Sequence, residues 1–207
     1  MSALVHIVDG DSSSQAGIDD LLRACGYRTK AYGSPDEILG QIADDASAGC
    51  IVLDVQLPDT VVPDLFDRLN KAGSCLPVIC LAGESDVRTG VKAIKAGAED
   101  FFTKPVASEE LIVAIDRAIA RHRLASEQEG WSRAARQRLG LLTRREREVF
   151  DLVIRGRLNK QVAFALGTTE RTVKAHRHKV MEKLQVRSLV ELVSCAERLG
   201  LLRNDEA

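Results

Sequence analysis

The first 120 residues alternate short apolar runs with stretches of helical spacing, and this alternation limits the possible folds more than any other feature. Apolar runs lie at residues 4–8, 50–53 and 78–81, and residues 27–32 and 100–103 are further strand candidates; helical signals occur between them. A continuously apolar run such as Cys50–Leu53 indicates a strand that is covered on both faces. Five such β-α units predict a doubly wound α/β domain with a parallel five-stranded sheet, which is a flavodoxin-like architecture.

Charged residues follow several of these predicted strands. Asp9 and Asp11 follow the first strand, Asp54 ends the third and Lys104 follows the fifth. Sites in parallel α/β sheets form beyond the carboxyl ends of the strands. Carboxylates clustered with one lysine suit a hard cation such as Mg²⁺, so we expect Asp9, Asp11 and Asp54 to surround this metal. A carboxylate beside Mg²⁺ can attack a phosphoryl group, with the metal and the lysine neutralising the charge.

The C-terminal third carries signals for a bundle of short helices. A capping box at residues 143–146 opens the first of them, and Asn159 is expected to cap the second. Gly167 would then supply a tight turn, and Thr168 or Thr169 would cap the third helix. Two helices joined by a glycine-containing turn predict a helix-turn-helix within an all-α, four-helix domain.

The third of these helices, expected over residues 169–184, has two chemically different sides. An apolar stripe contains Val173, Val180 and Leu184. The other side carries cations, hydrogen-bond donors and one methyl group at i, i+3, i+4 and i+7, namely Arg171, Lys174, Ala175 and His178. This combination can read base edges in a major groove, so the helix is predicted to enter double-stranded DNA.

The segments Leu142–Val149, Asn159–Ala163 and Glu170–Arg177 resemble the LuxR-type DNA-binding domain. The resemblance implies that Lys174, Ala175 and His178 face bases. It also implies phosphate contacts, for which the candidates are Asn159, Lys160, Arg171, Thr172 and His176. The last helix of such domains often forms a dimer, here through Leu189, Leu192, Val193 and Ala196, although these side chains could equally close the core.

The N-terminal half resembles the receiver domain of bacterial response regulators, on the acidic first strand end, Asp54, Leu57-Pro58 and Lys104-Pro105. The chain as a whole is therefore similar to response regulators of the FixJ/NarL type. The resemblance implies that Asp54 is the phosphoacceptor, that Lys104 contacts the phosphoryl oxygens and that Asp9 helps to place Mg²⁺. It further implies a sensor histidine kinase as partner and a homodimer as the active form.

Three positions depart from the usual receiver pattern. Gly10 stands where a second acid normally binds the metal, and Asp11 lies one residue further on. Ala82 replaces a hydroxyl residue at one switch position, while Phe101 keeps the aromatic switch position; Val62 replaces a glycine. Two inputs thus stay open: phosphorylation of Asp54, weak or not, and an atypical receiver controlled by a partner, a ligand or constitutive dimerisation.

Charge and domain organisation agree with this reading. Residues 1–120 carry 10 basic and 19 acidic side chains, a net charge of −9, whereas residues 121–207 carry 19 and 11, a net charge of +8. A basic half is typical of a nucleic-acid binder. We expect a receiver at 1–122, a helical linker at 123–138 that is interrupted at Gly130 before a second helical piece, and a LuxR-type domain at 139–207.

Other classes of protein fit the sequence less well. A flavodoxin-like enzyme would need a phosphate-binding glycine loop or a nucleophile elbow, and neither motif occurs, so we expect no enzyme. A receptor for a small diffusible signal would not place acids and a lysine at consecutive strand ends. Apolar runs are too short for a membrane span and no secretory signal is visible, which predicts a cytoplasmic protein without membrane contact.

Overall fold

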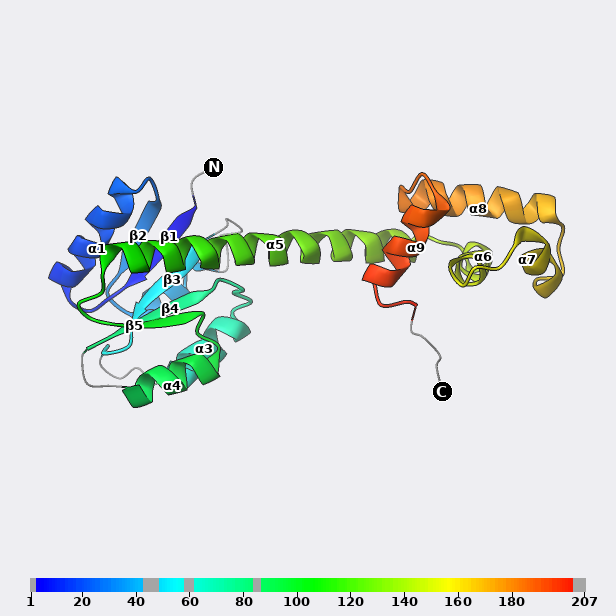
Figure 1. Cartoon of the computed structure of the whole chain (residues 1–207). Coiled ribbons are helices and arrows are strands. Elements are labelled where there is room, and N and C mark those ends of the chain that lie inside the picture. The colour runs from blue at the N-terminus through cyan, green and yellow to red at the C-terminus, as the bar shows by residue number, and fades with distance from the viewer. Residues whose placement is uncertain (1–2, 43–48, 58–61, 84–86, 203–207) are drawn as a thin grey trace. The chain divides into compact units, whose positions relative to one another are not determined.

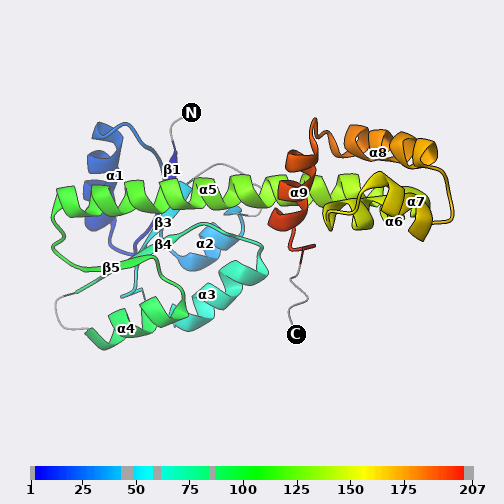
Figure 2. The same ribbon diagram turned by 45° about the vertical axis from the view of Figure 1, so that its right-hand side comes forward.

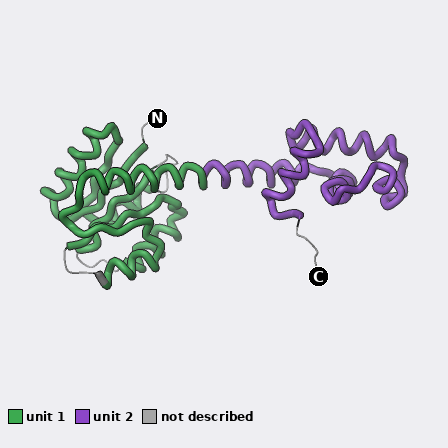
Figure 3. The backbone as a smooth tube through the Cα atoms, viewed as in Figure 1, with its two compact units in different colours: residues 1–125 green, residues 126–207 purple. Residues whose placement is uncertain are grey.

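The structure is a computed structural model that describes residues 3–42, 49–57, 62–83 and 87–202. Two compact units are formed by residues 1–125 and 126–207 (Figure 3). Pro58, one residue of the receiver-like motif, lies outside the described residues. Within the described part of the chain, no helix combines the length and the apolar character that a membrane crossing requires.

The first unit contains a parallel five-stranded sheet with the order β2-β1-β3-β4-β5. The strands are β1 (Leu4–Val8), β2 (Arg28–Tyr32), β3 (Gly49–Asp54), β4 (Val78–Ala82) and β5 (Asp100–Thr103). β1, β3 and β4 are buried along their whole length, as their unbroken apolar sequences predict for central strands. The predicted doubly wound architecture is therefore confirmed.

Helices cover both faces of this sheet. They are α1 (Ser12–Ala24), α2 (Pro35–Leu39), α3 (Val62–Lys71), α4 (Val87–Ala96) and α5 (Ser108–Gly140). α1 and α5 lie on one face, and α2, α3 and α4 lie on the other (Figures 1 and 2). Alternate side chains of β1 point to opposite faces of the sheet. Val5 and Ile7 pack with α1 and α5, while Val8 packs on the opposite face.

Helix α5 is continuous from Ser108 to Gly140, so the predicted interruption at Gly130 is wrong. Gly130 is exposed, and a Cβ atom there would meet nothing within 4 Å. A glycine inside a helix costs about 1 kcal/mol relative to alanine, and the surrounding Ala, Arg, Glu and Gln residues are good helix formers. Local propensity therefore outweighs one glycine. The predicted linker, 123–138, falls within this helix, and its bounds stay a prediction.

The second unit has its own hydrophobic core. Its helices are α6 (Arg144–Ile154), α7 (Asn159–Ala165), α8 (Glu170–Leu184) and α9 (Leu189–Arg198), and the end of α5 adds Ala135 and Leu139. The fully buried Phe150 of α6 packs in this core with Val173 and Val180 of α8. The predicted all-α helix-turn-helix domain is confirmed.

The helix caps follow the sequence signals with one exception. Thr143 and Glu146 form the predicted capping box, and Thr169 caps α8 through its side chain. Gly167 has a φ of 59°, the left-handed conformation that the turn requires. The expected cap at Asn159 is wrong: Leu158 occupies the N-cap position and Asn159 is the first residue of α7. The Asn159 side chain accepts a hydrogen bond from Arg177 of α8.

Candidate functional site

An acidic site lies at the carboxyl edge of the sheet, around the end of Lys104. The ammonium nitrogen Nζ of this lysine donates to Asp9 Oδ2 and to Asp54 Oδ2, at 2.8 Å in each case. Asp9 and Asp54 are only 2% and 8% exposed. The parallel register of β1 and β3 brings the two acids to the same edge, and Lys104 follows β5. The predicted meeting of Asp9, Asp54 and Lys104 is thus observed.

Ser14 is a member of this site that the sequence reasoning missed. Its hydroxyl donates to Asp9 Oδ2 at 2.7 Å and accepts a hydrogen bond from Lys104 Nζ at 3.0 Å. Ser14 lies in the first turns of α1, where serine is common for reasons of helix capping alone. No sequence motif marks this position. Its role becomes visible only in the structure, where the start of α1 lies beside the end of β1.

Opposite charges stabilise each other within the site. Burial alone would raise the pKa of the Asp9 carboxyl, but hydrogen bonds from Lys104, Ser14 and the backbone of Asp11 lower it below its ordinary value. Burial likewise opposes the charge of Lys104, yet its hydrogen bonds to Asp54 and Asp9 raise the lysine pKa. The resting site therefore holds an ionised Asp9 beside a cationic lysine at neutral pH.

Asp11 does not join the other two acids, so the expected three-carboxylate metal set needs correction. Its carboxylate is exposed and accepts a hydrogen bond from the backbone N–H of Ser13 at 3.0 Å, which makes it the N-cap of α1. In residues 3–42, 49–57, 62–83 and 87–202, no group of three His, Cys, Asp or Glu side chains could hold a metal ion. The one-residue shift from position 10 to position 11 redirects the side chain from the site to the helix end.

The two switch positions lie on adjacent strands. Ala82 is fully buried, and its carbonyl accepts a hydrogen bond from the backbone N–H of Lys104 at 2.6 Å. The half-buried ring of Phe101 lies against α4, where a Cβ atom on Gly90 would come within 2.8 Å of it. Gly90 therefore provides the space for Phe101, whereas Ala82 offers no hydroxyl to a group bound on Asp54.

Helix α8 presents a basic face to solvent. The predicted base-facing residues Lys174, Ala175 and His178 are all exposed, and so is Arg171 on the same side of the helix. Val173, Val180 and Leu184 are buried in the core of the second unit. The division of this helix into a buried stripe and an exposed cationic face agrees with the sequence-based expectation.

The five predicted phosphate contacts have different surroundings. Lys160 and Arg171 are exposed. Asn159 Oδ1 instead accepts a hydrogen bond from Arg177 at 2.6 Å, which joins α7 to α8. Thr172 Oγ1 shares a hydrogen bond with the capping Thr169. His176 is half-buried, and its Nδ1 has no hydrogen-bond partner among the residues that the structure describes.

An ion pair between a buried carboxylate and a partly exposed lysine holds the C-terminal end of α8, and the sequence did not predict it. Glu146, 3% exposed at the start of α6, accepts a hydrogen bond from Lys183 Nζ at 2.6 Å, and the same ammonium binds the carbonyl of Leu141 at 3.0 Å. The hydrogen bond from Lys183, aided by that from the Thr143 backbone, lowers the pKa of Glu146 to about 2. One carboxylate thus caps α6 and anchors α8.

The predicted dimer contacts on α9 also need correction. Leu192 and Ala196 are 1% and 0% exposed within their own unit, where they close the core. Val193 is half-buried, and Leu189 is exposed. Leu192 and Ala196 cannot contact a partner while they fill this core, so the alternative reading of these two residues, as core residues, is the one observed.

A lysine-bridged pair of acids at the edge of a receiver-like sheet, joined to a helix-turn-helix with an exposed cationic helix, defines a DNA-binding response regulator. Two family models match the chain: "Response regulator receiver domain" over residues 5–116 and "Bacterial regulatory proteins, luxR family" over residues 140–196. The chain belongs to the two-component response regulators of the FixJ/NarL type, which combine these two domains.

Named relatives share this organisation along nearly the whole chain. The response regulator protein TodT of Pseudomonas putida is 37% identical over 203 residues, which cover 96% of this chain and 87% of TodT. The transcriptional regulatory protein FixJ of Azorhizobium caulinodans is 33% identical over 203 residues, 98% of this chain and 96% of FixJ. The solved structure of the response regulator StyR is 33% identical, with a TM-score of 0.85, and covers 96% of this chain and 100% of StyR.

Several general statements follow from membership of this family. The chain is a DNA-binding transcriptional regulator, and transcriptional regulators of this family are typically not enzymes. A receiver domain indicates a histidine kinase as partner, and receiver domains generally bind Mg²⁺ for phosphorylation.

Proposed function

We propose that Asp54 is the phosphoacceptor of this regulator and that Lys104 contacts the phosphoryl oxygens. The observation that carries the proposal is the position of Lys104 Nζ, 2.8 Å from the buried Asp54 Oδ2. Asp54 Oδ1 accepts a hydrogen bond from the backbone N–H of Gln56 at 2.9 Å, which orients the carboxylate and leaves Oδ2 as the attacking oxygen. The new bond joins Oδ2 to phosphorus, while the bond from phosphorus to the donor's leaving group breaks.

Asp9 and Asp54 are the residues that would hold Mg²⁺, without Asp11. Two carboxylates suit this ion, because Mg²⁺ keeps several waters and commonly takes one or two carboxylates from a protein. When bound, the metal supplies positive charge that offsets the charge on the phosphoryl oxygens. Each carboxylate keeps an orienting hydrogen bond from a backbone N–H, that of Asp11 to Asp9 Oδ1 and that of Gln56 to Asp54 Oδ1.

The lysine has to change partners when Asp54 is modified. Lys104 Nζ now binds both acids and Ser14, so contact with a phosphoryl oxygen replaces its bond to Asp54 Oδ2. Ala82 offers no hydroxyl to the phosphoryl group. One contact that would favour the phosphorylated conformation is thus missing, and a ligand shifts an equilibrium only through contacts that differ between states. We therefore infer a smaller response to phosphorylation than a hydroxyl at this position would give.

The output of the regulator is binding of double-stranded promoter DNA by α8. The exposed Lys174, Ala175 and His178 would face the base edges, and Lys160 and Arg171 would contact phosphates. Asn159 acts through Arg177 by holding α7 against α8. Phosphorylation would control DNA binding through self-association, because two copies can occupy two half-sites of an operator.

The input is tested by treating the full chain with acetyl phosphate and Mg²⁺ and then measuring both its mass and its affinity for DNA. The DNA probe is a duplex selected from a random pool by the wild-type chain. A phosphoryl adduct and tighter DNA binding are expected for the wild type, and neither for Asp54→Asn. If Asp54→Asn and the wild type respond equally, or neither responds, the phosphorylation-independent alternative replaces this proposal.

The output is tested with substitutions on and beside the reading face. Lys174→Ala or His178→Ala should weaken binding to the selected duplex more than binding to an unselected one. Lys160→Ala is the matched control. Loss of a phosphate contact should weaken binding to both duplexes equally, and it should reduce the slope of log affinity against log salt concentration by about one. Equal losses on both duplexes for Lys174→Ala would show that this side of α8 does not read bases.

A further inference from the structure

A groove in the second unit lies between the C-terminal part of α5 and α9, and residues 184–186 at the end of α8 complete its lining. Its volume is about 270 Å³. Trp131 and Arg138 line it from α5, and Glu191, Cys195 and Arg198 line it from α9. Their spacings of three, four and seven residues place each set on one helix face. Small-molecule pockets usually measure roughly 300–1,000 Å³, so this groove suits a small ligand.

Two guanidinium groups from different helices line this groove. Among the residues that the structure describes, neither Arg138 nor Arg198 has an ion-pair partner, whereas most other pairs of this unit use Arg or Lys of α6 and α8. Both cations act on the same thiol. Burial raises the pKa of Cys195, while the positive charges of Arg198 and Arg138 act in the opposite direction. Positive charge from both helices therefore reaches the middle of the groove.

Trp131 holds Arg198 in place at the groove. The guanidinium carbon Cζ lies 3.6 Å from the centroid of the indole ring. A guanidinium that stacks on an aromatic ring keeps its N–H donors in its own plane, where they can bind an anion. Stacking also orders the side chain before a ligand arrives, which lowers the entropy cost of binding. The pair therefore forms a prepared donor beside an apolar surface.

The turn after α8 borders the groove in an unusual backbone conformation. Gln185 has a φ of 56° and a ψ of 39°, and it is the only non-glycine residue with a positive φ that the structure describes. Glycine adopts this conformation without steric cost and is the usual residue at such a helix end. The chain instead carries an exposed amide here, which adds a hydrogen-bond donor to the lining.

We propose that this groove binds a small organic carboxylate. The guanidiniums of Arg138 and Arg198 bind the carboxylate, because a guanidinium matches the two oxygens of this group. The apolar body of the ligand packs against Trp131, the buried Leu184 and the half-buried Val186. An anion with an apolar part thus matches both the charge and the surface of the groove.

Glu191 is the acid of this lining, and it does not cancel the two cations. Its Oε2 accepts a hydrogen bond from the backbone N–H of Arg187 at 2.8 Å, which ties the carboxylate to the start of α9. Two cations and one acid leave the lining with a net positive charge. The groove therefore favours an anion over a neutral or cationic ligand of the same size.

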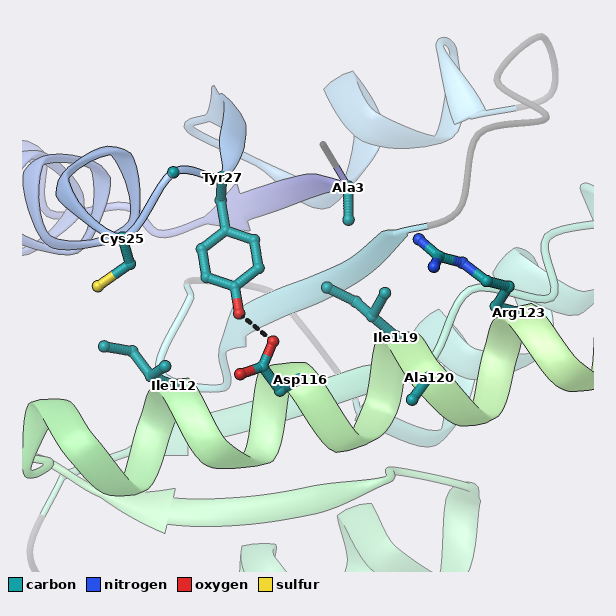
Figure 4. A pocket seen from close by; sticks show the side chains of 9 residues that line it. Ala3, Cys25, Tyr27, Ile112, Asp116, Ile119, Ala120 and Arg123 are labelled. Carbon is teal, nitrogen blue, oxygen red and sulfur yellow. Dashed lines mark hydrogen bonds between the residues drawn. The ribbon is translucent and has the colours of Figure 1, made fainter. Parts of the chain in front are cut away.

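A hollow of the first unit lacks this charge balance and serves as a comparison. It lies between α5 and the loop before β2, with a volume of about 430 Å³ (Figure 4). The hydroxyl of Tyr27 donates to Asp116 Oδ1 at 2.5 Å across this hollow, and Arg123 lines it as well. The charges of Asp116 and Arg123 sum to zero, so this hollow has no preference for an anion.

A ligand in the groove would contact α5, the end of α8 and α9 together. Because a ligand that binds only the folded state stabilises it, occupancy should stabilise the second unit. The inference adds an input to the DNA-binding unit that is separate from the proposed phosphorylation of Asp54.

The test uses the fluorescence of Trp131, the only tryptophan, in the full chain at constant ionic strength. Hexanoate is the probe, since it joins one carboxylate to a short apolar chain. Hexanol is the neutral control, and inorganic phosphate is an anion without an apolar part. Hexanoate should change the fluorescence saturably in the millimolar range and should raise the urea midpoint of the second unit. Neither control compound should do so at the same concentrations.

Three variants locate the binding. Arg138→Gln should bind hexanoate about tenfold more weakly, because a hydrogen bond between charged groups is lost. Arg136→Gln is the matched control, since it removes the same charge from an exposed position of α5 outside the groove lining. Arg123→Gln removes a cation from the other hollow. Both control variants should bind like the wild type, and circular dichroism checks that each variant is folded.

Saturable binding that is weakened only by Arg138→Gln supports the site. The absence of a saturable response to hexanoate below about 50 mM, or an equal loss in Arg136→Gln, would overturn it. An equal response to hexanol or to phosphate, or a loss of binding in Arg123→Gln, would also overturn the proposal, because the carboxylate and the apolar chain would not act together in this groove. None of these results depends on phosphorylation of Asp54, so the proposed function is tested separately.

Discussion

Removal of the charge on Glu146 should destabilise the DNA-binding unit in a way that depends on pH. Glu146→Gln keeps an oxygen that can accept from the Thr143 backbone but loses the charged hydrogen bond from Lys183. A fall of the Glu146 pKa from 4.5 to about 2 corresponds to about 3 kcal/mol of folding free energy at neutral pH. Because the Lys183 side chain is 32% exposed and solvent screens it, we expect a loss of about 1–2 kcal/mol.

The sign of the pH dependence follows from the direction of the shift. The folded-state pKa of Glu146 is lower than its unfolded value, so its contribution is complete above about pH 4.5 and disappears as the pH falls towards about 2. The difference in stability between the wild type and Glu146→Gln should therefore shrink over that range.

Urea unfolding, monitored by tryptophan fluorescence, measures this difference in the stability of the second unit. Trp131 is the only tryptophan of the chain, and it packs against the core of the second unit, with Arg198 3.6 Å from its ring centroid. Glu148→Gln on the same helix is the matched control, since Glu148 pairs only at the surface with Arg144 and Arg145. A Glu146→Gln loss no larger than that of Glu148→Gln, or one that stays constant down to pH 2, would refute the reasoning.

Two further substitutions test the receiver unit. Gly49→Ala should prevent folding of this unit or destabilise it by several kcal/mol, because a Cβ atom would overlap the carbonyl oxygen of Leu4 on the paired strand; circular dichroism and urea unfolding measure the loss. Ser14→Ala should raise the pKa of Asp9, since the hydroxyl now donates to its ionised form while Lys104 remains in place; a carboxyl ¹³C titration that shows no rise would contradict the role of Ser14.

The sequence predicted the elements that depend on local or periodic signals. Apolar runs such as Cys50–Leu53 identified the central strands, and the capping box at residues 143–146 and the turn at Gly167 identified helix boundaries. Asp9, Asp54 and Lys104 could be brought together because parallel strands place their carboxyl ends at one edge. In each case a regular geometry, that of a strand, a helix end or a parallel sheet, fixes where a residue lies once its position in the sequence is known.

The remaining features depend on contacts between elements, which no local pattern contains. Asn159 has a side chain suited to a cap, yet Arg177 of another helix engages it. Asp11 lies one residue beyond the position of the expected second acid, but its carboxylate accepts a hydrogen bond from the backbone at the start of α1. Ser14 and the Glu146–Lys183 pair gain their roles only from how α1 and α8 pack. The apolar positions of α9 fitted a core and an interface equally, and only burial separates these roles.

The bridge that Lys104 forms between Asp9 and Asp54 has a consequence for the unmodified protein. Two carboxylates held side by side in a buried place need a positive charge close by, because like charges at short distance disfavour each other. Lys104 supplies this positive charge from within the chain, so the site of Asp9 and Asp54 does not depend on a cation from solution. Mg²⁺ held by Asp9 and Asp54, as proposed above, would have to displace this tethered amine from the two carboxylates.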